Sequence, residues 1–375
     1  MRVVIVGAGI GGLSAAIALE NVGHDVVIVD RDQEAAAAGL GIAVGPNAFA
    51  ALEKLGVADA VRQRGNTAGG RRIYTSRGRR LSEGPWRGGV VRRADLHEVL
   101  TQRLGVPIRS GHDCVSVEQD GRRALARFSD GTEEAGDVLI AADGLRSTIR
   151  AQLFNDGDPQ YRGSTSFRGI AEITHPMIAD HIIETWGRGC RIGLQNLGGG
   201  WTYWFTAWNT PKGTLVPPAD RKRELLARFR GWHDPIEAVL AATEDDRILQ
   251  TDLTDRDPLP HWTVGRITLL GDAAHPMTPD LGQGGAQAIE DGVTLGQVLT
   301  LDAVPEDALR TYEQRRMPIA YDIHQRARRH YRVAQLENPF ACEIRDLTVR
   351  VLPSPVARLI GVRRPQFVET GPQGT

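Results

Sequence analysis

The fold is decided at the N-terminus, where residues 1–19 read MRVVIVGAGIGGLSAAIAL. Residues 2–6 are a β-branched apolar run, as expected of a parallel strand that is buried on both faces. A glycine-rich turn follows, and residues 13–19 have the composition of a helix. A second buried strand over residues 25–29 ends at Asp30, which completes a βαβ unit of near-minimal length. The sequence therefore predicts an α/β fold with a Rossmann-like parallel sheet.

The turn inside this unit fits the pattern G-x-G-x-x-G. The first glycine permits the tight turn, the second lets a pyrophosphate approach the backbone, and the third allows close packing of helix and strand. The start of the helix offers free N–H groups to the phosphates, and the acidic residue that ends the second strand can accept hydrogen bonds from a ribose. The pattern does not separate NAD from FAD. The predicted contacts are Gly7, Gly9, Gly11, Gly12, Asp30 and Arg31.

The composition of the chain argues against several classes of function. The 375 residues include 45 Lys and Arg against 46 Asp and Glu, so balanced charge argues against a general nucleic-acid binder. The three cysteines lie far apart, which argues against disulfides and a zinc site and fits a reducing compartment. Glycines interrupt the apolar N-terminus, so it is unlike a secretory signal, and no window is long enough to span a membrane. We expect a cytoplasmic protein without metal or integral membrane association.

A chain of this length favours more than one structural unit. Between residues 161 and 261 the pattern changes to alternating segments, which predict an antiparallel sheet with one buried face. The buried-strand pattern returns at residues 266–270, so the nucleotide-binding unit is interrupted and then resumed. We assign residues 1–70, 92–160 and 261–320 to that discontinuous unit, residues 71–91 and 161–260 to the sheet domain, and residues 321–375 to a C-terminal helical segment.

Two further motifs identify the cofactor by resemblance. Residues 266–291, RITLLGDAAHPMTPDLGQGGAQAIED, resemble the second FAD fingerprint of the class A, aromatic-hydroxylase family of flavoprotein monooxygenases. Residues 137–150, DVLIAADGLRSTIR, resemble the DG motif of the same family. The match extends from Met1 to about Arg316 and is most similar to salicylate- and urate-hydroxylase-like members. It implies a p-hydroxybenzoate-hydroxylase-like FAD-binding domain, an inserted antiparallel-sheet domain for the substrate, and a helical C-terminus.

The resemblance also implies positions that hold FAD. Asp272 would bind the ribityl chain, and Asp143 would serve both FAD and the reduced nicotinamide. A helix start at the turn after Asp272 would stabilise the negative charge of reduced flavin. Arg93 would contact the pyrophosphate. The other implied contacts are Ala43, Cys114, Gly282, Gln283, Gly284, Gly285 and Ala286.

The family reaction is the implied activity. NADH or NADPH reduces FAD, O₂ adds to the flavin as a C4a-hydroperoxide, and one oxygen passes to a small aromatic or heteroaromatic substrate. Alternation over residues 201–205 places Trp201, Tyr203 and Phe205 on one face, and Arg191 shares a face with Gly193 and Gln195. This pattern resembles that of salicylate- and urate-hydroxylase-like members, and the resemblance implies that Tyr203 and Arg191 are candidate catalytic residues that meet an anionic substrate. Each is also explained as a structural residue.

Other assignments follow from the same motifs. Pro279 is expected to line the flavin face, and His275 is expected to be structural. The protein would act as a monomer or homodimer. Three alternatives stay open: an epoxidase or tailoring oxygenase with the same flavin chemistry, an NAD-dependent dehydrogenase, and a non-catalytic flavin-binding protein.

Overall fold

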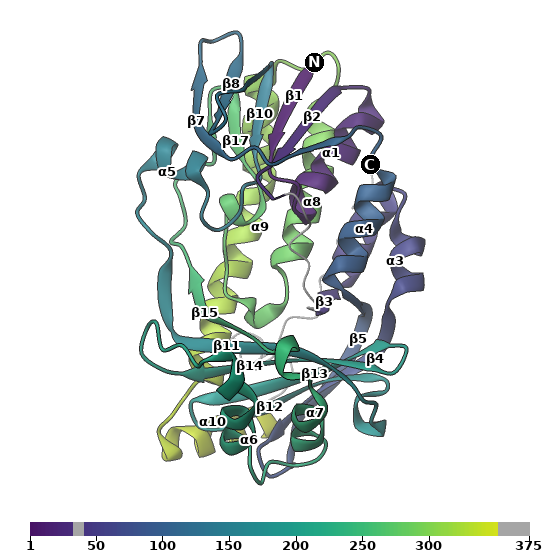
Figure 1. Ribbon diagram of the computed structural model, residues 1–375, viewed down its shortest axis with the longest axis vertical. Coiled ribbons are helices and arrows are strands. Elements are labelled where there is room, and N and C mark those ends of the chain that lie inside the picture. Colours follow the sequence, from purple (N-terminus) through teal and green to yellow (C-terminus); the bar gives the residue numbers. More distant parts are fainter. Residues whose placement is uncertain (33–40, 352–375) are drawn as a thin grey trace.

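The computed structural model describes residues 1–32 and 41–351, which form two lobes joined by a long helix (Figure 1). The upper lobe contains a six-stranded sheet in the order β16-β17-β10-β1-β2-β6. Only β16 runs antiparallel to its neighbour; the other pairs are parallel, as predicted for a Rossmann-like sheet. The strands are β1 (Arg2–Val6), β2 (Asp25–Asp30), β6 (Ile108–Ser110), β10 (Val138–Ala141), β16 (Thr263–Val264) and β17 (Ile267–Leu269).

Two helices of this lobe, α1 (Ile10–Val22) and α8 (Gly284–Val298), pack closely because glycines line their contact. A Cβ on Gly292 would lie 2.5 Å from the backbone nitrogen of Ala15, and Gly296 lies against Ala18 in the same way. Since Ala15 faces Gly292 and Ala18 faces Gly296, the two helices run parallel. Their N-termini, both predicted to face the cofactor, therefore point the same way.

The rest of the upper lobe surrounds this core. A small antiparallel sheet consists of β7 (Cys114–Gln119), β8 (Ala124–Phe128) and β9 (Glu133–Gly136), and β8 and β9 form a hairpin. The remaining helices are α2 (Pro46–Lys54), α3 (Ala58–Arg64), α4 (Arg93–Arg103) and α5 (Thr148–Phe154).

The lower lobe is an eight-stranded sheet in the order β15-β11-β14-β13-β12-β4-β5-β3. It is antiparallel as predicted, except that β12 runs parallel to β4. No hairpin joins these two strands, which come from distant parts of the chain, so nothing imposes an antiparallel pairing. The strands are β3 (Gly41–Val44), β4 (Asn66–Thr75), β5 (Arg80–Arg92), β11 (Gln160–Glu172), β12 (His181–Trp186), β13 (Cys190–Gly198), β14 (Trp201–Asn209) and β15 (Leu249–Asp255).

The two faces of this sheet differ because side chains alternate along each strand. Trp204 packs on the outer face with Phe229, under α6 (Arg221–Arg228) and α7 (Ile236–Ala242), and its Nε1 donates to Thr243 Oγ1 at 2.8 Å. Tyr203 and Phe205 lie on the opposite face, as predicted. The register pairs Gln195 with Tyr203, Gly193 with Phe205 and Arg191 with Ala207, which places these residues on that same face. Short 3₁₀ turns are η1 (Pro176–Ile178), η2 (Pro218–Asp220) and η3 (Asp245–Arg247).

The C-terminal helices are α9 (Pro305–Ala334), which runs from the upper lobe to the lower, and α10 (Pro339–Val351) (Figure 1). The boundary expected between residues 320 and 321 falls inside α9, which continues through Pro318 without a break. Likewise β3 and the start of β4 join the large sheet rather than the nucleotide-binding unit, since β5 pairs with both.

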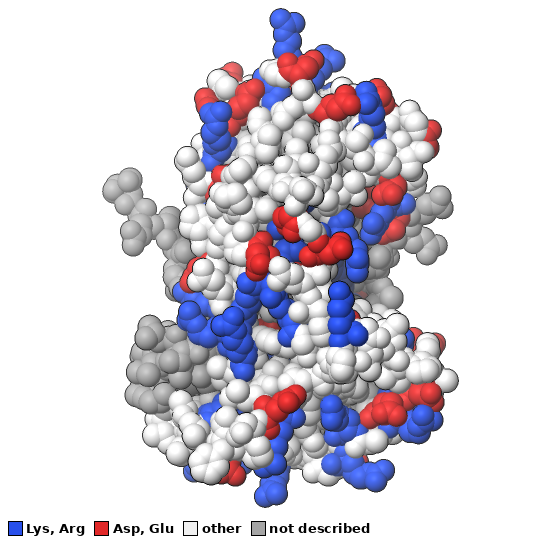
Figure 2. All heavy atoms as spheres, turned by 90° about the vertical axis from the view of Figure 1, so that its left-hand side faces the viewer, with Lys and Arg blue, Asp and Glu red and all other residues white. Residues whose placement is uncertain are grey.

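Charged side chains of both signs gather at the narrow middle of the molecule (Figure 2). Among the buried ion pairs, Arg328 and Arg162 both pair with Asp255, which is fully buried. These partners hold the pKa of Asp255 well below its ordinary value. The ion pairs tie α9 to the first and last strands of the inserted sheet.

Candidate active site

Each glycine of the turn after β1 has a distinct environment. Gly7 adopts φ +107°, and a Cβ there would clash with the carbonyl oxygen of Ala142. A Cβ on Gly12 would clash with the carbonyl oxygen of Gly7. A Cβ on Gly9 would meet no atom within 4 Å, so Gly9 borders open space where a pyrophosphate can approach. Helix α1 starts here with no side-chain cap and no acidic residue in its first turn, which leaves its N–H groups free for an anion.

This difference gives a paired prediction. Gly9→Ala should leave the melting temperature almost unchanged but weaken FAD binding at least about 10-fold, because only the ligand's space is filled. Gly12→Ala should destabilise the protein by about 1–3 kcal/mol or more through overpacking. Thermal melting of the apoprotein and FAD titration measure the two effects. Full FAD affinity in Gly9→Ala would contradict the assignment of this turn.

The residues after β2 and at the start of α4 border the same turn. Asp30 accepts hydrogen bonds from the backbone N–H of Ala8 (2.5 Å) and of Asp32 (2.8 Å). The carboxylate thus orders the turn, and its remaining lone pairs stay available to a ribose. Arg31 is exposed. One turn after the exposed Arg93, the Nε2 atom of His97 hydrogen-bonds the carbonyl oxygen of Ala8 at 2.8 Å, which holds α4 beside the glycine turn.

Asp143 and Cys114 lie within electrostatic reach of each other. Burial raises the pKa of the Asp143 carboxyl, while the backbone N–H of Ile149 donates to it at 3.3 Å and favours the charged form. Burial and the charge of Asp143 raise the pKa of the Cys114 thiol to about 12. A neutral thiol at pH 7 is not a nucleophile, so Cys114 can serve a ligand only through packing and its backbone.

The second FAD motif folds into two short turns before α8. Asp272 lies in η4 (Gly271–Ala273), where its side chain is exposed and no described residue pairs with its carboxylate. A Cβ on Gly284 would lie 3.8 Å from Asp272 Oδ1, and a Cβ on Gly282 would lie 3.8 Å from the Cβ of Ala43. The structure therefore brings β3, Asp272 and the start of α8 around one space.

Unpartnered polar atoms border this space. Asn47 Nδ2 donates to Gln283 Oε1 at 3.1 Å, yet Asn47 Oδ1 and Gln283 Nε2 are buried without a hydrogen bond. Buried polar atoms are almost always paired, so these atoms fit a ligand rich in donors and acceptors. Helix α8 also begins without a side-chain cap or an acidic residue in its first turn. Gly285 packs against Ile42 and Ala286 is buried, so these two predicted residues shape the helix start. The residues present fit FAD.

Tyr203 projects from β14 of the large sheet toward β3. Its ring packs directly on Gly41 of β3, where any side chain would overlap it. No described residue hydrogen-bonds its hydroxyl, and across the strands the buried Oε1 of Gln195 is also unpartnered. Burial raises the pKa of Tyr203, partly offset by the positive charges of Arg168 and Arg93. Tyr203 is therefore neutral at pH 7 and can donate a hydrogen bond.

Arg191 is fully buried and does not face open space. Its guanidinium pairs with Glu184 of β12 at 2.8 Å and with Asp280 of η5 (Pro279–Leu281). Arg191 and the nearby His330 hold the pKa of Asp280 below its ordinary value although the carboxyl is buried. The geometry favours a positioning role for Arg191: it fixes the turn that starts with the exposed Pro279 and leads into Gly282.

Asp280, Glu184 and His330 were not predicted from the sequence. The sequence did offer one indication of Asp280: it is an acidic residue directly after Pro279, in a turn of otherwise small or apolar residues. Glu184 and His330 reach the cluster from β12 and α9, and nothing in their local sequence indicates this.

His275 is structural, as expected. Its Nε2 hydrogen-bonds Asp291 Oδ2 at 2.6 Å, and Arg316 donates to the other carboxylate oxygen at 2.7 Å. Asp291 also accepts from the N–H of Gly271 at 3.1 Å, which locks the Asp272 turn onto α8. Despite full burial, these partners lower the pKa of Asp291 from 3.8 to about 2.

This shift predicts a dependence of stability on pH. A carboxyl with a lowered folded-state pKa stabilises the protein above pH 4, and the contribution is lost as the pH falls from about 4 to about 2. The full contribution is about 2 kcal/mol, of which about 1 kcal/mol should be gone at pH 3. Asp291→Asn should be less stable than wild type at pH 7, and the gap should narrow at pH 3. Urea unfolding at both pH values measures the difference in the free energy of unfolding between Asp291→Asn and wild type. A difference that is the same at pH 7 and pH 3 would contradict the lowered pKa of Asp291.

Comparison with known proteins agrees with this fold and with FAD as the cofactor. The fold and site define a flavoprotein with a split Rossmann-like domain, and the family model described as "FAD binding domain" matches residues 1–327. The chain belongs to this family and is an FAD-dependent monooxygenase of the class A, aromatic-hydroxylase-like type. This decides against the dehydrogenase and the non-catalytic alternatives.

Three similar proteins are informative. Aurachin C monooxygenase/isomerase of Stigmatella aurantiaca is 39% identical over 94% of this chain and 95% of its own length. Zeaxanthin epoxidase of Nicotiana plumbaginifolia is 36% identical over 88% of this chain, which spans 54% of that protein. The crystal structure of Klebsiella pneumoniae HpxO with FAD and uric acid superposes with a TM-score of 0.89 at 29% identity, covering 96% of this chain and 95% of the other.

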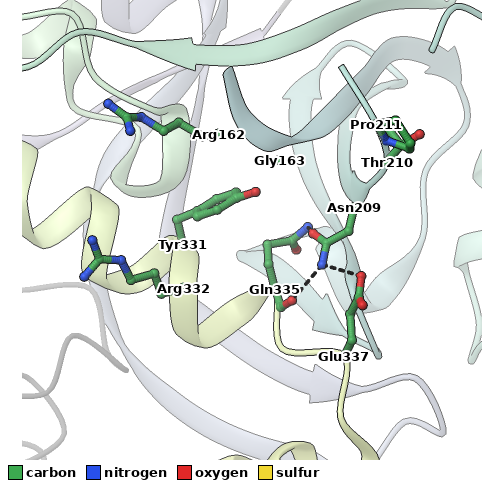
Figure 3. A pocket seen from close by; sticks show the side chains of 9 residues that line it. All are labelled: Arg162, Gly163, Asn209, Thr210, Pro211, Tyr331, Arg332, Gln335 and Glu337. Atoms are coloured by element: carbon green, nitrogen blue, oxygen red, sulfur yellow. Dashed lines mark hydrogen bonds between the residues drawn. The ribbon is translucent and has the colours of Figure 1, made fainter. Parts of the chain in front are cut away.

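Away from the predicted site, a surface hollow of about 570 Å³ lies where β11, β14 and the end of α9 meet (Figure 3). Its walls are held together by Asn209, whose Nδ2 donates to the carbonyl oxygen of Gln335 (3.0 Å) and to Glu337 (2.7 Å). None of the predicted site residues lines it. Within residues 1–32 and 41–351 no helix could cross a membrane, and no cluster of His, Cys, Asp and Glu could hold a metal.

Proposed function

We propose that this monooxygenase consumes NADH or NADPH and O₂ to hydroxylate an aromatic or heteroaromatic small molecule. The observation that carries the proposal is a pair of polar groups opposite each other on one face of the large sheet: the free hydroxyl of Tyr203 and the unpartnered Oε1 of Gln195. Tyr203 contacts Gly41 of β3, the strand next to the proposed FAD site, and Gln195 lies opposite Tyr203 on the neighbouring strand. The uric acid complex of HpxO supports a flat, polar heteroaromatic substrate.

The reactive cofactor and the protein have separate tasks in this proposal. FAD, when bound, supplies the oxygen activation. Tyr203 donates a hydrogen bond to a substrate oxygen, and Gln195 accepts one from a substrate N–H or O–H group. Trp201 and Phe205 pack with the Tyr203 cluster, so this apolar face excludes water from the reacting atoms.

The cofactor contacts proposed for FAD follow the same geometry. The backbone of the glycine turn and Arg93 bind the pyrophosphate, and Asp30 with Arg31 binds the adenosine side. Asp272 binds the ribityl chain. The ring contacts are Ala43, Pro279, Gly282, Gln283, Gly284, Gly285 and Ala286, with Asp143 and Cys114 lining the remaining side.

Tyr203→Phe tests the role of the hydroxyl. We expect formation of hydroxylated product to fall about 10- to 100-fold while reduction of the flavin by NAD(P)H stays nearly unchanged. Rapid-reaction absorbance and product analysis separate the two steps. Tyr161→Phe, which removes a hydroxyl bonded to the carbonyl oxygen of Thr210 outside the site, is the matched control. Equal product formation in both variants would assign Tyr203 to packing.

Epoxidation is the second candidate, and the similarity to zeaxanthin epoxidase favours it. The two reactions differ in product, because an epoxidised substrate retains the added oxygen in a three-membered ring at a former double bond. Incubation of the purified protein with ¹⁸O₂ and a panel of phenols, heteroaromatic acids and polyenes, read by mass spectrometry, distinguishes them.

The first experiment is the visible spectrum of the purified protein, followed by NADH and NADPH oxidation with the same compounds. Flavin absorbance and oxidation accelerated by an aromatic compound, with little peroxide released, would support the proposal. Oxidation that yields only peroxide with every aromatic compound, but product with a polyene, would replace hydroxylation by epoxidation.

A further inference from the structure

Helix α10 exposes a row of large apolar side chains. Phe340 is 76% exposed, Ile344 58%, Leu347 62% and Val351 67%. Their spacings are four, three and four residues, so with 3.6 residues per turn they lie on one narrow face of the helix. The opposite face packs on the protein through buried residues, namely Cys342, Arg345 and Val349.

The orientation of α10 is held by specific contacts, so the exposed row is a property of the fold. The Arg345 guanidinium donates to the carbonyl oxygens of Gly187 and Ala334, both at 3.3 Å. The turn between α9 and α10 is tied to the sheet by Asn209, which donates to Glu337 (Figure 3). These contacts come from both sides of the helix start and prevent rotation of the apolar row toward the body of the protein.

The spacing of the row matches a helix–helix seam. Apolar residues at alternating intervals of three and four are the a and d positions of a heptad, which pack against an equivalent row on another helix. With Ile344 and Val351 at a, the exposed Glu343 and Arg350 both occupy g positions beside the seam. In an antiparallel pair, g positions face each other across the seam. Glu343 of one copy then meets Arg350 of the second copy, and the two-fold axis repeats this pair.

We propose that this face of α10 is the interface of a homodimer in which two copies of α10 pack antiparallel around a two-fold axis. Phe340 of one copy lies against Val351 of the other, and Ile344 lies against Leu347. The charge pattern favours a second copy over a lipid surface, because a membrane-binding helix carries an excess of basic residues beside its apolar face. Here one acid and one base flank the row.

The interface is short, and this sets its expected strength. Two heptads on each side bury less than a standard interface of about 1,200–2,000 Å². We therefore expect a dimer with a dissociation constant in the micromolar range, about 1–50 μM. None of the residues proposed for FAD or the substrate lies on α10, so the interface itself uses no residue of either site.

The test is sedimentation velocity of the FAD-loaded full-length chain between about 1 and 100 μM, a range that brackets the expected dissociation constant. Wild type should shift from monomer to dimer with concentration, and the double variant Ile344→Glu/Leu347→Glu should stay monomeric. Arg315→Glu, an exposed change on α9, is the control and should dimerise as wild type does. Flavin absorbance and thermal melting confirm that each variant is folded.

A charge swap tests the antiparallel arrangement. Glu343→Arg alone and Arg350→Glu alone each place like charges together twice, and each should weaken the dimer at least about 10-fold. Combining them restores opposite charges and should return the dissociation constant to within about threefold of wild type. If both single variants dimerise more weakly and the combined variant does not regain the wild-type dissociation constant, the antiparallel arrangement is wrong.

Four other results overturn the proposal. A wild-type chain that stays monomeric at 100 μM excludes the dimer, and a dimer unaffected by Ile344→Glu/Leu347→Glu uses another surface. A full-length monomer that dimerises only after truncation behind Val351 assigns the apolar row to residues 352–375. Finally, the wild-type monomer could sediment with phosphatidylglycerol vesicles while the Ile344→Glu/Leu347→Glu variant does not. That result would assign the apolar row to a lipid surface.

Discussion

Replacing Asp272 with alanine is expected to weaken FAD binding about 10- to 150-fold, because a hydrogen bond to a charged group contributes about 1.5–3 kcal/mol. The carboxylate is exposed, it has no partner among the described residues, and it lies beside Gly284 at the start of α8. The turn that carries it is locked by Asp291, so the loss should come from the missing acceptor and not from a rearranged loop.

The measurement is FAD titration of the apoprotein, followed by the ratio of flavin to protein absorbance after gel filtration. Asp272→Asn keeps one acceptor oxygen and should bind FAD more tightly than Asp272→Ala. Asp307→Ala, which removes an exposed carboxylate paired with Arg310 on α9, is the control and should bind FAD normally. Full FAD occupancy in Asp272→Ala would contradict the assignment of the second motif.

The second large effect is expected at Arg191. Arg191→Met should lower the free energy of unfolding by about 3–5 kcal/mol, because Glu184 and Asp280 would be left as buried carboxylates without their cation. The pKa of Asp280 should rise toward and above its ordinary value for the same reason. Because Asp280 lies in the turn that carries Pro279, the variant should also bind FAD more weakly.

Urea unfolding of apoprotein and FAD-loaded protein measures the change at Arg191. The matched control is Arg310→Met, since Arg310 pairs with Asp307 on the surface and such pairs contribute no more than about 1 kcal/mol. Adding Glu184→Gln and Asp280→Asn to Arg191→Met removes the uncompensated charges and should recover part of the stability. If Arg191→Met is as stable as the control, the buried cluster does not hold the turn.

Much of the candidate FAD site could be predicted from the sequence because its determinants are local. The glycine turn follows from the order strand, glycines and helix within residues 2–19, and Gly7 needs a positive φ that its neighbours impose. The position of Asp272 follows from a motif whose residues are close together in the chain. Alternation along β14 also placed Tyr203 and Trp204 on opposite faces, because the strand period is two.

The substrate side was decided by contacts between distant segments. Arg191 was a candidate catalytic residue, yet its charge is taken up by Glu184 seven residues before it and by Asp280 eighty-nine residues after it. Tyr203 lies against β3 because this strand, more than 150 residues earlier, joins the same sheet and places Gly41 against its ring. The sequence around each of these residues does not indicate such pairings between distant segments.

By itself, then, the sequence determined the Rossmann-like unit, the family and the cofactor, since short-range sterics and closely spaced motifs specify all three. Only the tertiary structure decided which charges are neutralised, which polar atoms stay free, and which face of α10 is exposed. The physical reason is that burial and ion pairing depend on which segments the fold brings together, and a residue's neighbours in the chain do not determine this.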